Sequence, residues 1–131
     1  MLTAQELIYK AMINECIKNN KDLECSVINY DGRGSYCDLW YHLKEIYDIC
    51  YEIEYEFREG METNLHPKTS SRHYEIDVCA MKCDGVWVAW DYYYGGGKHG
   101  EPEAFDWISN ARIVKCTEKE VTEIEYTFEE L

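Results

Sequence analysis

Five carboxylates recur at steps of three and four residues in the middle of the chain. They are Glu45, Asp48, Glu52, Glu56 and Glu59. On a helix this spacing forms one row, with neighbours about 5 to 6 Å apart along the axis at about 1.5 Å per residue. Phosphates along a nucleic-acid strand are roughly 6 to 7 Å apart, so the row has the charge and spacing to engage basic groups. The alternative interpretation is the ordinary charged solvent face of an amphipathic helix.

A second acidic block lies near the C-terminus. Its members Glu118, Glu120, Glu123, Glu125, Glu129 and Glu130 are interrupted by a single base, Lys119. Two like-charged blocks repel each other, and proteins selected only for solubility usually intersperse the two signs. The two blocks therefore predict a partner with a complementary basic surface.

An aromatic run leads into a glycine loop that ends in a basic pair. The candidate ligand-binding residues are Trp90, Tyr92, Tyr93, Tyr94, Lys98 and His99. The aromatic rings can stack on a base, and the glycine amides and the two basic side chains can hold a phosphate. The loop is not a P-loop, because neither Ser nor Thr follows Lys98 and the first glycine of the motif is missing. The alternative is a plain connection through which the chain leaves a strand.

The seven cysteines, at positions 16, 25, 37, 50, 79, 83 and 116, form no CxxC pair. Neither they nor the four histidines have the ligand spacing of a zinc site, and no thiol is singled out with a partner histidine for catalysis. The N-terminus carries no secretory h-region, so we expect a cytoplasmic protein with free thiols. The sequence predicts no enzyme, no metal and no cofactor.

The charge is strongly negative and unevenly placed. The chain has 26 acidic and 13 basic residues among 131, a formal charge of -13. Residues 1–34, 35–63, 64–100 and 101–131 carry -1, -6, 0 and -6. Such a field repels nucleic acid and anionic membranes and attracts basic surfaces. A hydrophobic content of 46% excludes a disordered acidic tail, and we expect one domain over residues 1–131.

Two N-terminal helices are expected. Thr3-Ala4-Gln5-Glu6 is a capping box, and the apolar spacing after it predicts a helix over about 3–19. A second helix is predicted from a cap at Ser35 to about residue 58, with Gly60 ending it. Residues 51–57 alternate strictly and also fit a strand, but positions 50, 53 and 57 continue the apolar stripe of the preceding residues, which favours the helix.

The residues after the second helix predict a mostly antiparallel four-stranded sheet, so the expected fold class is α+β. Asp84-Gly85 predicts a hairpin of strands 74–83 and 86–94 with Val88 opposite Met81. Both faces of this hairpin are apolar near the turn, so it is either covered on both sides or uses one face for binding. The other predictions are a loop over 60–72, a short helix at 103–110, strands at 111–117 and 121–128, and a short strand at 24–30.

A short, acidic, aromatic-rich chain with many unpaired cysteines and no enzyme motif resembles accessory proteins of phages and mobile elements. It is similar in this respect to the DNA-mimic inhibitors of restriction and CRISPR systems. The resemblance rests on composition and on the row from Glu45 to Glu59. It implies non-catalytic inhibition of a basic, nucleic-acid-binding host defence protein in the host cytoplasm, without direct binding to nucleic acid or membrane.

Two other functions stay open on the sequence. One is a protein that sequesters a nucleotide signal through the aromatic and glycine-loop residues, and the other is a structural or regulatory interaction domain. The oligomeric state is open as well, a homodimer included.

Overall fold

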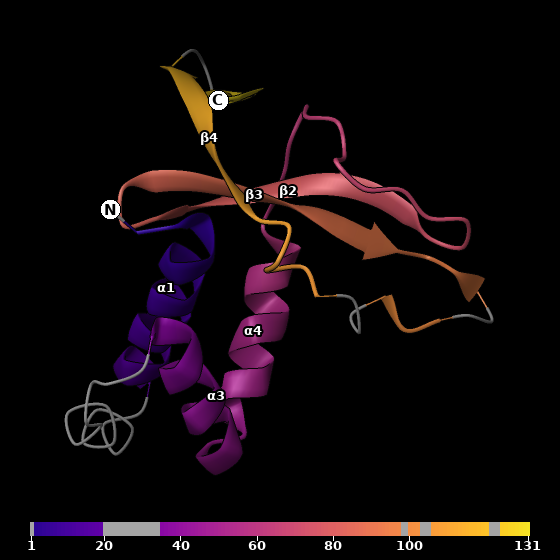
Figure 1. Ribbon diagram of the computed structural model, residues 1–131. Helices are drawn as coiled ribbons and strands as arrows, with labels where there is room; N and C mark the ends of the chain where they lie inside the picture. Colours follow the sequence, from indigo (N-terminus) through magenta and orange to yellow (C-terminus); the bar gives the residue numbers. More distant parts are fainter. Residues whose placement is uncertain (1, 20–34, 98–99, 103–105, 121–123) are drawn as a thin grey trace.

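The computed structural model describes residues 2–19, 35–97, 100–102, 106–120 and 124–131. Its helices are α1 (Ala4–Asn19), α3 (Tyr36–Ile46) and α4 (Ile49–Glu59). Its strands are β1 (Met61–Glu62), β2 (Glu75–Cys83), β3 (Val86–Tyr94), β4 (Arg112–Glu120) and β5 (Ile124–Glu130). The strands form one antiparallel sheet in the order β1-β2-β3-β4-β5. The fold is therefore α+β, as predicted, with the helices on one side of the β2–β3 hairpin (Figure 1).

The helices begin where the sequence provides caps. The Thr3 hydroxyl accepts a hydrogen bond from the backbone N–H of Glu6 at 3.2 Å. The Ser35 hydroxyl accepts from the N–H of Asp38 at 3.2 Å, and the Asp38 carboxylate accepts from the N–H of Ser35 at 3.1 Å. These bonds satisfy backbone donors that a helix leaves unpaired in its first turn.

The single helix predicted over 35–58 is wrong, because the chain forms two helices there. Tyr47 is extended, with φ -121° and ψ 114°, so α3 ends before it and α4 starts after Asp48. The break allows both helices to pack on α1, with Trp40 of α3 and Cys50 of α4 fully buried in the same core cluster. The helical interpretation of residues 51–57 is confirmed, and α4 ends at Gly60 with φ +52°.

The predicted hairpin is confirmed in turn and register. Asp84 and Gly85 have φ values of 53° and 79°, and Met81 pairs with Val88. The sheet has five strands where four were predicted. The additional strand, β1, lies inside the segment predicted to be a loop and pairs with Ala80 and Cys79 of β2. This strand could not be predicted from the sequence, because its two residues are too few to show the alternation of apolar and polar side chains. Its pairing with β2 depends on the turn that follows α4.

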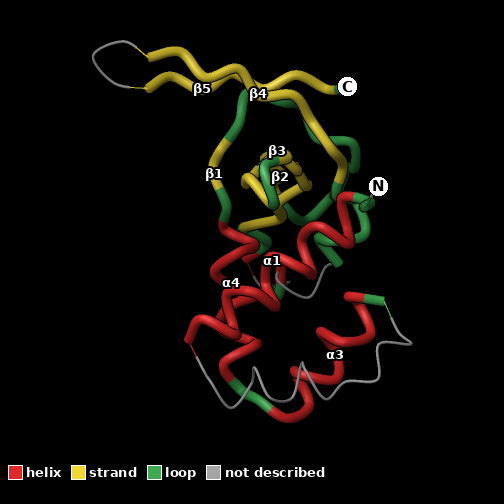
Figure 2. The backbone as a smooth tube through the Cα atoms, turned by 90° about the vertical axis from the view of Figure 1, so that its left-hand side faces the viewer, coloured by secondary structure: helices red, strands yellow, loops and turns green. Residues whose placement is uncertain are grey.

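Both faces of the β2–β3 hairpin are covered. On one face Cys79, Val88 and Trp90 join the core formed with the helices. On the other face a second cluster contains Val78, Ala80, Ala89, Val114 and Phe128. Figure 2 shows why: β2 and β3 lie at the centre while β1 and β4 curve around them, so β4 and β5 cover the face away from the helices.

Asn64, just after β1, brings the two edges of the curled sheet together. Its side-chain amide donates to the carbonyl oxygen of Phe128 in β5 at 3.1 Å, and its side-chain oxygen accepts from the Phe128 N–H at 2.9 Å. One side chain therefore occupies both backbone groups of Phe128, as a neighbouring strand would.

A buried ion pair joins three strands to the segment before β2. Asp91 of β3 is fully buried, and its carboxylate accepts from the Arg112 guanidinium at 3.2 Å and from the backbone N–H groups of Lys68 and Thr69 at 2.9 and 2.8 Å. Arg112 also contacts Glu130 of β5 at 2.9 Å. The Asp91 charge is thus compensated by one cation and two backbone donors, which a buried carboxylate requires.

The short helix predicted at 103–110 is not found in the part that the structure describes, since residues 107–110 form a turn. The turn is held by the Asp106 carboxylate, which accepts from the Ser109 N–H at 3.2 Å, and by Trp107, whose ring centroid lies 4.9 Å from that of Trp90. The predicted strand at 24–30 lies outside the described residues. Among the described residues no helix combines the length and the hydropathy needed to cross a bilayer.

Candidate protein-binding surface

The predicted carboxylate row is carried mainly by α4. Asp48 lies at its start and Glu52, Glu56 and Glu59 lie within it, all exposed. At about 1.5 Å per residue they span about 16 Å along one side of the helix. Glu45 is also exposed, but it belongs to α3, on the other side of the break at Tyr47. The structure therefore brings four of the five predicted residues onto one helix face and separates the fifth.

Most of these carboxylates have no cation beside them in the part of the chain that the structure describes. Among the described residues, Glu45, Asp48, Glu52 and Glu56 take part in no ion pair. Glu59 accepts a hydrogen bond from the Tyr92 hydroxyl at 3.0 Å. Unpaired carboxylates at an exposed helix face can accept Lys or Arg side chains from another molecule without first losing an internal partner.

Glu54 shows the contrast on the buried side of the same helix. Its carboxylate accepts from the Trp40 indole N–H at 3.0 Å and contacts the Lys44 ammonium at 3.0 Å. It therefore holds α4 against α3, and this α4 carboxylate is satisfied inside the protein.

Exposed tyrosines accompany the carboxylates. The side chains of Tyr51 and Tyr55 on α4 and Tyr41 on α3 are each more than half exposed. The Lys44 ammonium lies 4.8 Å from the ring centroid of Tyr51 and 5.4 Å from that of Tyr41, which holds these rings in place through cation–π contacts. Large aromatic side chains with a polar tip are the side chains that protein interfaces favour.

We name this surface the α4 face and define it by Asp48, Tyr51, Glu52, Tyr55 and Glu56. The carboxylates were predicted from the sequence, whereas Tyr51 and Tyr55 were not singled out. Their signal was present, because positions 51 and 55 are one helical turn apart and lie outside the apolar stripe at 50, 53 and 57.

The C-terminal end of α4 is fixed to β3. The guanidinium of Arg58, which is buried, donates to the Tyr93 carbonyl oxygen and lies 4.3 Å from the ring centroid of Tyr92. The Trp90 indole N–H donates to the Arg58 carbonyl oxygen at 3.0 Å. Burial, together with the hydrogen bond to Glu59, raises the pKa of Tyr92. The α4 face is therefore presented by a helix whose end is held by several bonds.

Three members of the second acidic block have a basic residue beside or opposite them in the β4–β5 ribbon. The strand register places Lys119 opposite Glu125 and Lys115 opposite Glu129, and Glu130 is bound by Arg112. Glu118 faces Tyr126. The side chain of Glu120 and all of Glu123 lie outside the part that the structure describes.

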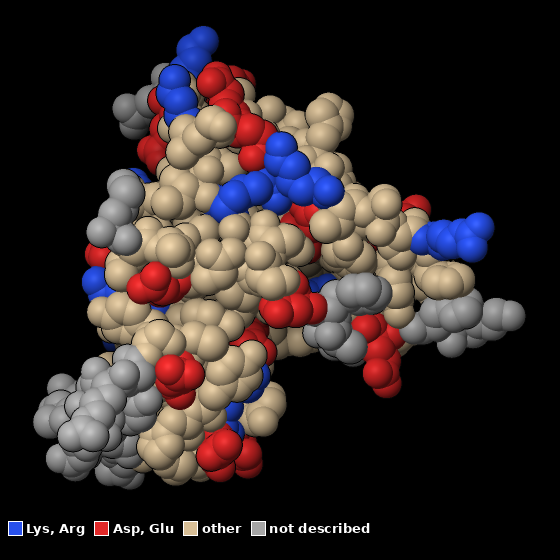
Figure 3. All heavy atoms as spheres, viewed as in Figure 1, with Lys and Arg blue, Asp and Glu red and all other residues tan. Residues whose placement is uncertain are grey.

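The two acidic blocks are also far apart in the fold. Figures 1 and 2 place α4 and the β4–β5 ribbon on opposite sides of the β2–β3 hairpin. On the face seen in Figure 3, acidic side chains are separated by uncharged ones and do not merge into one patch. The structure therefore does not join the two predicted blocks into a single surface.

The aromatic run is divided between the two faces of the sheet. Trp90 is fully buried on the helix side, where Tyr92 and Tyr94 follow with ring centroids 6.0 Å apart. Tyr93 is buried on the opposite face, and its hydroxyl lies 2.6 Å from that of Thr69. Lys98 and His99 lie outside the described residues. Trp90, Tyr92 and Tyr94 therefore share one face of the sheet and Tyr93 lies on the other, because neighbouring residues of a strand point to opposite faces.

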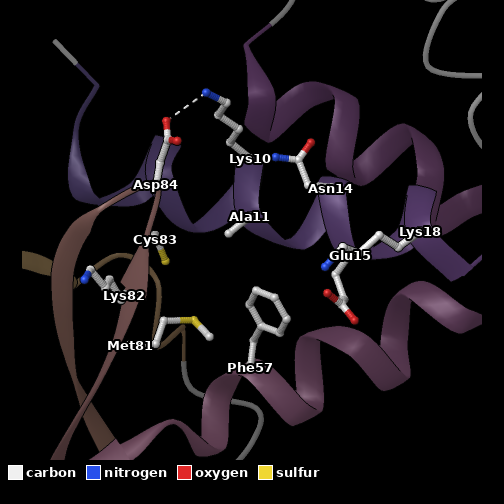
Figure 4. Close-up of a pocket in the computed structure, with 10 residues that line it drawn as sticks. All are labelled: Lys10, Ala11, Asn14, Glu15, Lys18, Phe57, Met81, Lys82, Cys83 and Asp84. Atoms are coloured by element: carbon white, nitrogen blue, oxygen red, sulfur yellow. Dashed lines mark hydrogen bonds and ion pairs between the residues drawn. The ribbon is translucent and has the colours of Figure 1, made fainter.

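A different cleft lies between α1, α4 and the end of β2. It has a volume of about 270 Å³ and a floor of Ala11, Phe57, Met81 and Cys83. Three lysines, Lys10, Lys18 and Lys82, and two carboxylates, Glu15 and Asp84, also line it. Figure 4 shows Phe57 and Met81 pointing toward each other below Ala11, and Lys10 reaching Asp84 at 2.9 Å.

This cleft can hold a small molecule with an apolar part and a negative group. The hydrogen bond to Asp84 raises the pKa of Lys10, which stays charged. These residues were not predicted from the sequence, although Lys10, Asn14 and Lys18 recur every four residues on one side of α1. The remainder of the lining comes from α4 and β2 and depends on the tertiary fold.

The cysteines that the structure describes are free, and four of them, Cys16, Cys50, Cys79 and Cys83, are buried. Burial raises the pKa of the Cys83 thiol to about 11 and that of the Cys79 thiol to about 12. Thiols with raised pKa values stay protonated near neutral pH and are poor nucleophiles. Among the described residues no three His, Cys, Asp or Glu side chains gather closely enough to bind a metal ion.

No protein-family model matches the chain, and neither the curated proteins nor the solved structures include a match to it. What the protein binds is therefore inferred from its own surfaces.

Proposed function

We propose that the protein is a non-enzymatic binding protein whose α4 face docks into the basic cleft of a nucleic-acid-binding protein and excludes the nucleic acid. One observation carries this proposal: α4 presents exposed carboxylates next to exposed tyrosines. Asp48, Glu52 and Glu56 form no ion pair with any described residue, and the side chains of Tyr51 and Tyr55 are more than half exposed.

Each part of the α4 face has a physical role in this proposal. The carboxylates take positions that phosphates would occupy against Lys and Arg, and the net charge of -13 speeds the approach to a basic surface. The rings of Tyr51 and Tyr55 supply apolar contact area at low entropic cost, because a tyrosine side chain has few rotatable bonds. The resemblance in composition to inhibitors of restriction and CRISPR systems suggests a host defence effector as the partner.

The test compares two sets of charge reversals that change the net charge equally. Glu52→Lys with Glu56→Lys alters the α4 face, whereas Glu75→Lys with Glu101→Lys alters exposed carboxylates elsewhere. Proteins captured by the unmodified chain are tested for competition by DNA and RNA and for elution by salt. We expect the first double variant to lose capture and the second to keep it. Equal capture by both variants, or capture that nucleic acid does not reduce, contradicts the proposal.

A second candidate function is the binding of a small anionic molecule such as a nucleotide. The observation that favours it is the cleft of Figure 4, where three lysines and two carboxylates, Glu15 and Asp84, line an apolar floor, so that bases outnumber acids in a chain of strongly negative charge. Its lining does not include the predicted residues Trp90 and Tyr92 to Tyr94, of which Trp90 is fully buried and Tyr93 lies on the opposite face from Tyr92. Calorimetry with a nucleotide panel tests it: binding that is lost in Lys18→Ala and kept in Lys119→Ala supports this function, and no binding by any nucleotide rejects it.

A further inference from the structure

The outer edge of β5 carries backbone groups that point away from the sheet. Asn64 bonds both the N–H and the carbonyl oxygen of Phe128, so these two groups face away from β4. In an antiparallel ladder every second residue directs its N–H and C=O to the same side. The backbone groups of Tyr126 and Ile124 therefore point outward as well, whereas those of Thr127 and Glu125 bond β4.

Asn64 covers this edge only at Phe128. No described strand pairs with β5 on its outer side, and no described backbone group bonds the N–H or the oxygen of Ile124 or Tyr126. Figure 2 shows this half of the β4–β5 ribbon extending away from the rest of the molecule. An exposed row of unpaired backbone groups is a template for the addition of another strand.

The side chains beside this edge differ on the two faces of the ribbon. Ile124 and Tyr126, on the face shared with Phe128, are 49% and 38% exposed. Glu125 and Glu129, on the other face, are exposed carboxylates. They lie opposite Lys119 and Lys115 in the register, but among the described residues neither takes part in an ion pair. A strand added here would place alternate side chains next to an apolar surface and next to carboxylates.

We propose that the free edge of β5 at Ile124–Tyr126 binds an extended segment of a partner protein in which apolar residues alternate with Lys or Arg. The backbone N–H and C=O groups of Ile124 and Tyr126 form main-chain hydrogen bonds with the added segment. The carboxylates of Glu125 and Glu129 favour a segment that carries Lys or Arg beside them. This surface lies across the β2–β3 hairpin from α4, so the inference does not depend on the α4 face.

A second copy of the chain is a poorer occupant of the same edge. Two β5 strands paired in antiparallel fashion would bring Glu125 and Glu129 of one copy beside the same carboxylates of the other. Like charges that face each other across two strands are destabilising, and acidic edge residues protect sheet edges against self-association.

The test uses the full chain and a synthetic peptide that alternates valine with lysine. Tyr126→Pro removes the outward N–H, while Tyr126→Val removes the ring and keeps the N–H. Proline is tolerated at an edge position whose N–H faces solvent, so the β4 pairing is retained in both variants. We expect the proline variant to bind the peptide at least about fivefold more weakly than the valine variant, the effect of one main-chain hydrogen bond.

Three measurements complete the test. Hydrogen exchange on the unmodified chain should slow at the Ile124 and Tyr126 amides when the peptide is added, which checks the inference even if the proline variant fails to fold. A peptide with glutamate in place of lysine should not bind. Equal peptide affinity of the two Tyr126 variants, unchanged exchange at these amides, or a homodimer that Tyr126→Pro dissociates would each overturn the proposal.

Discussion

Replacement of Gly60 by alanine tests how α4 is joined to the sheet. Gly60 follows the last residue of the helix with φ +52° and ψ -153°, a conformation that residues with a Cβ rarely adopt. A Cβ built there lies 2.7 Å from Cζ2 of Trp90 and 3.0 Å from the carbonyl oxygen of Ala80. Neither neighbour can yield easily, because Trp90 is fully buried and bonded to Arg58, and the oxygen belongs to the backbone of β2.

The expected loss of stability has two parts. The backbone conformation costs about 1 to 2 kcal/mol for a residue with a Cβ. Forcing a methyl group against a packed ring and a backbone oxygen adds about 1 to 3 kcal/mol. We therefore expect Gly60→Ala to lower the free energy of unfolding by about 2 to 5 kcal/mol, a large part of the 5 to 15 kcal/mol typical of proteins of this size.

Gly85→Ala is the matched control. Gly85 also has a positive φ, +79°, but a Cβ there has no atom within 4 Å. This variant should lose only the conformational part, about 1 to 2 kcal/mol. Urea unfolding followed by tryptophan fluorescence measures both, with equal slopes required for the comparison. If the two variants lose the same stability, the close approach of Gly60 to Trp90 is not what makes glycine necessary, and the reasoning fails.

Two further predictions concern buried ionisable groups. Arg112→Ala leaves the Asp91 carboxylate buried without a cation, and we expect a loss of about 3 kcal/mol in urea unfolding; a loss no larger than that of the exposed Lys119→Ala would contradict this role. The pKa values of Cys83 and Cys79 are raised to about 11 and 12 from a starting value of 9.0, so the unfolded chain ionises first as the pH rises. The stability that these thiols contribute is complete below about pH 9 and declines as the pH rises through 11. The decline between pH 9 and 11 should be smaller in Cys83→Ala, and an unchanged profile would argue against the burial of this thiol.

The features that the sequence predicted correctly depend on local chemistry. The caps at Thr3 and Ser35 and the helix end at Gly60 each involve residues within a few positions of one another. The Asp84-Gly85 turn needs two residues that tolerate positive φ, and it fixed the register of the β2–β3 hairpin. Residues 51–57 fitted both a helix and a strand, and the helix was predicted correctly because the apolar stripe of the preceding residues continues through positions 50, 53 and 57. The acidic side of α4 followed from the same spacing.

The features that were missed depend on residues far apart in the chain. The break at Tyr47 occurs without glycine or proline and lets α3 and α4 both pack on α1. Glu125 and Glu129 lie opposite Lys119 and Lys115, and Glu130 binds Arg112, only because β4 and β5 pair in one register. Tyr93 lies apart from Trp90, Tyr92 and Tyr94 because neighbouring residues of a strand point to opposite faces of the sheet. Composition and spacing alone predicted the α+β class, the helix caps, the helical state of residues 51–57, the central hairpin and the charge. Tertiary packing decided which carboxylates stay unpaired, because a salt bridge or a strand edge is defined by neighbours that only the folded chain brings together.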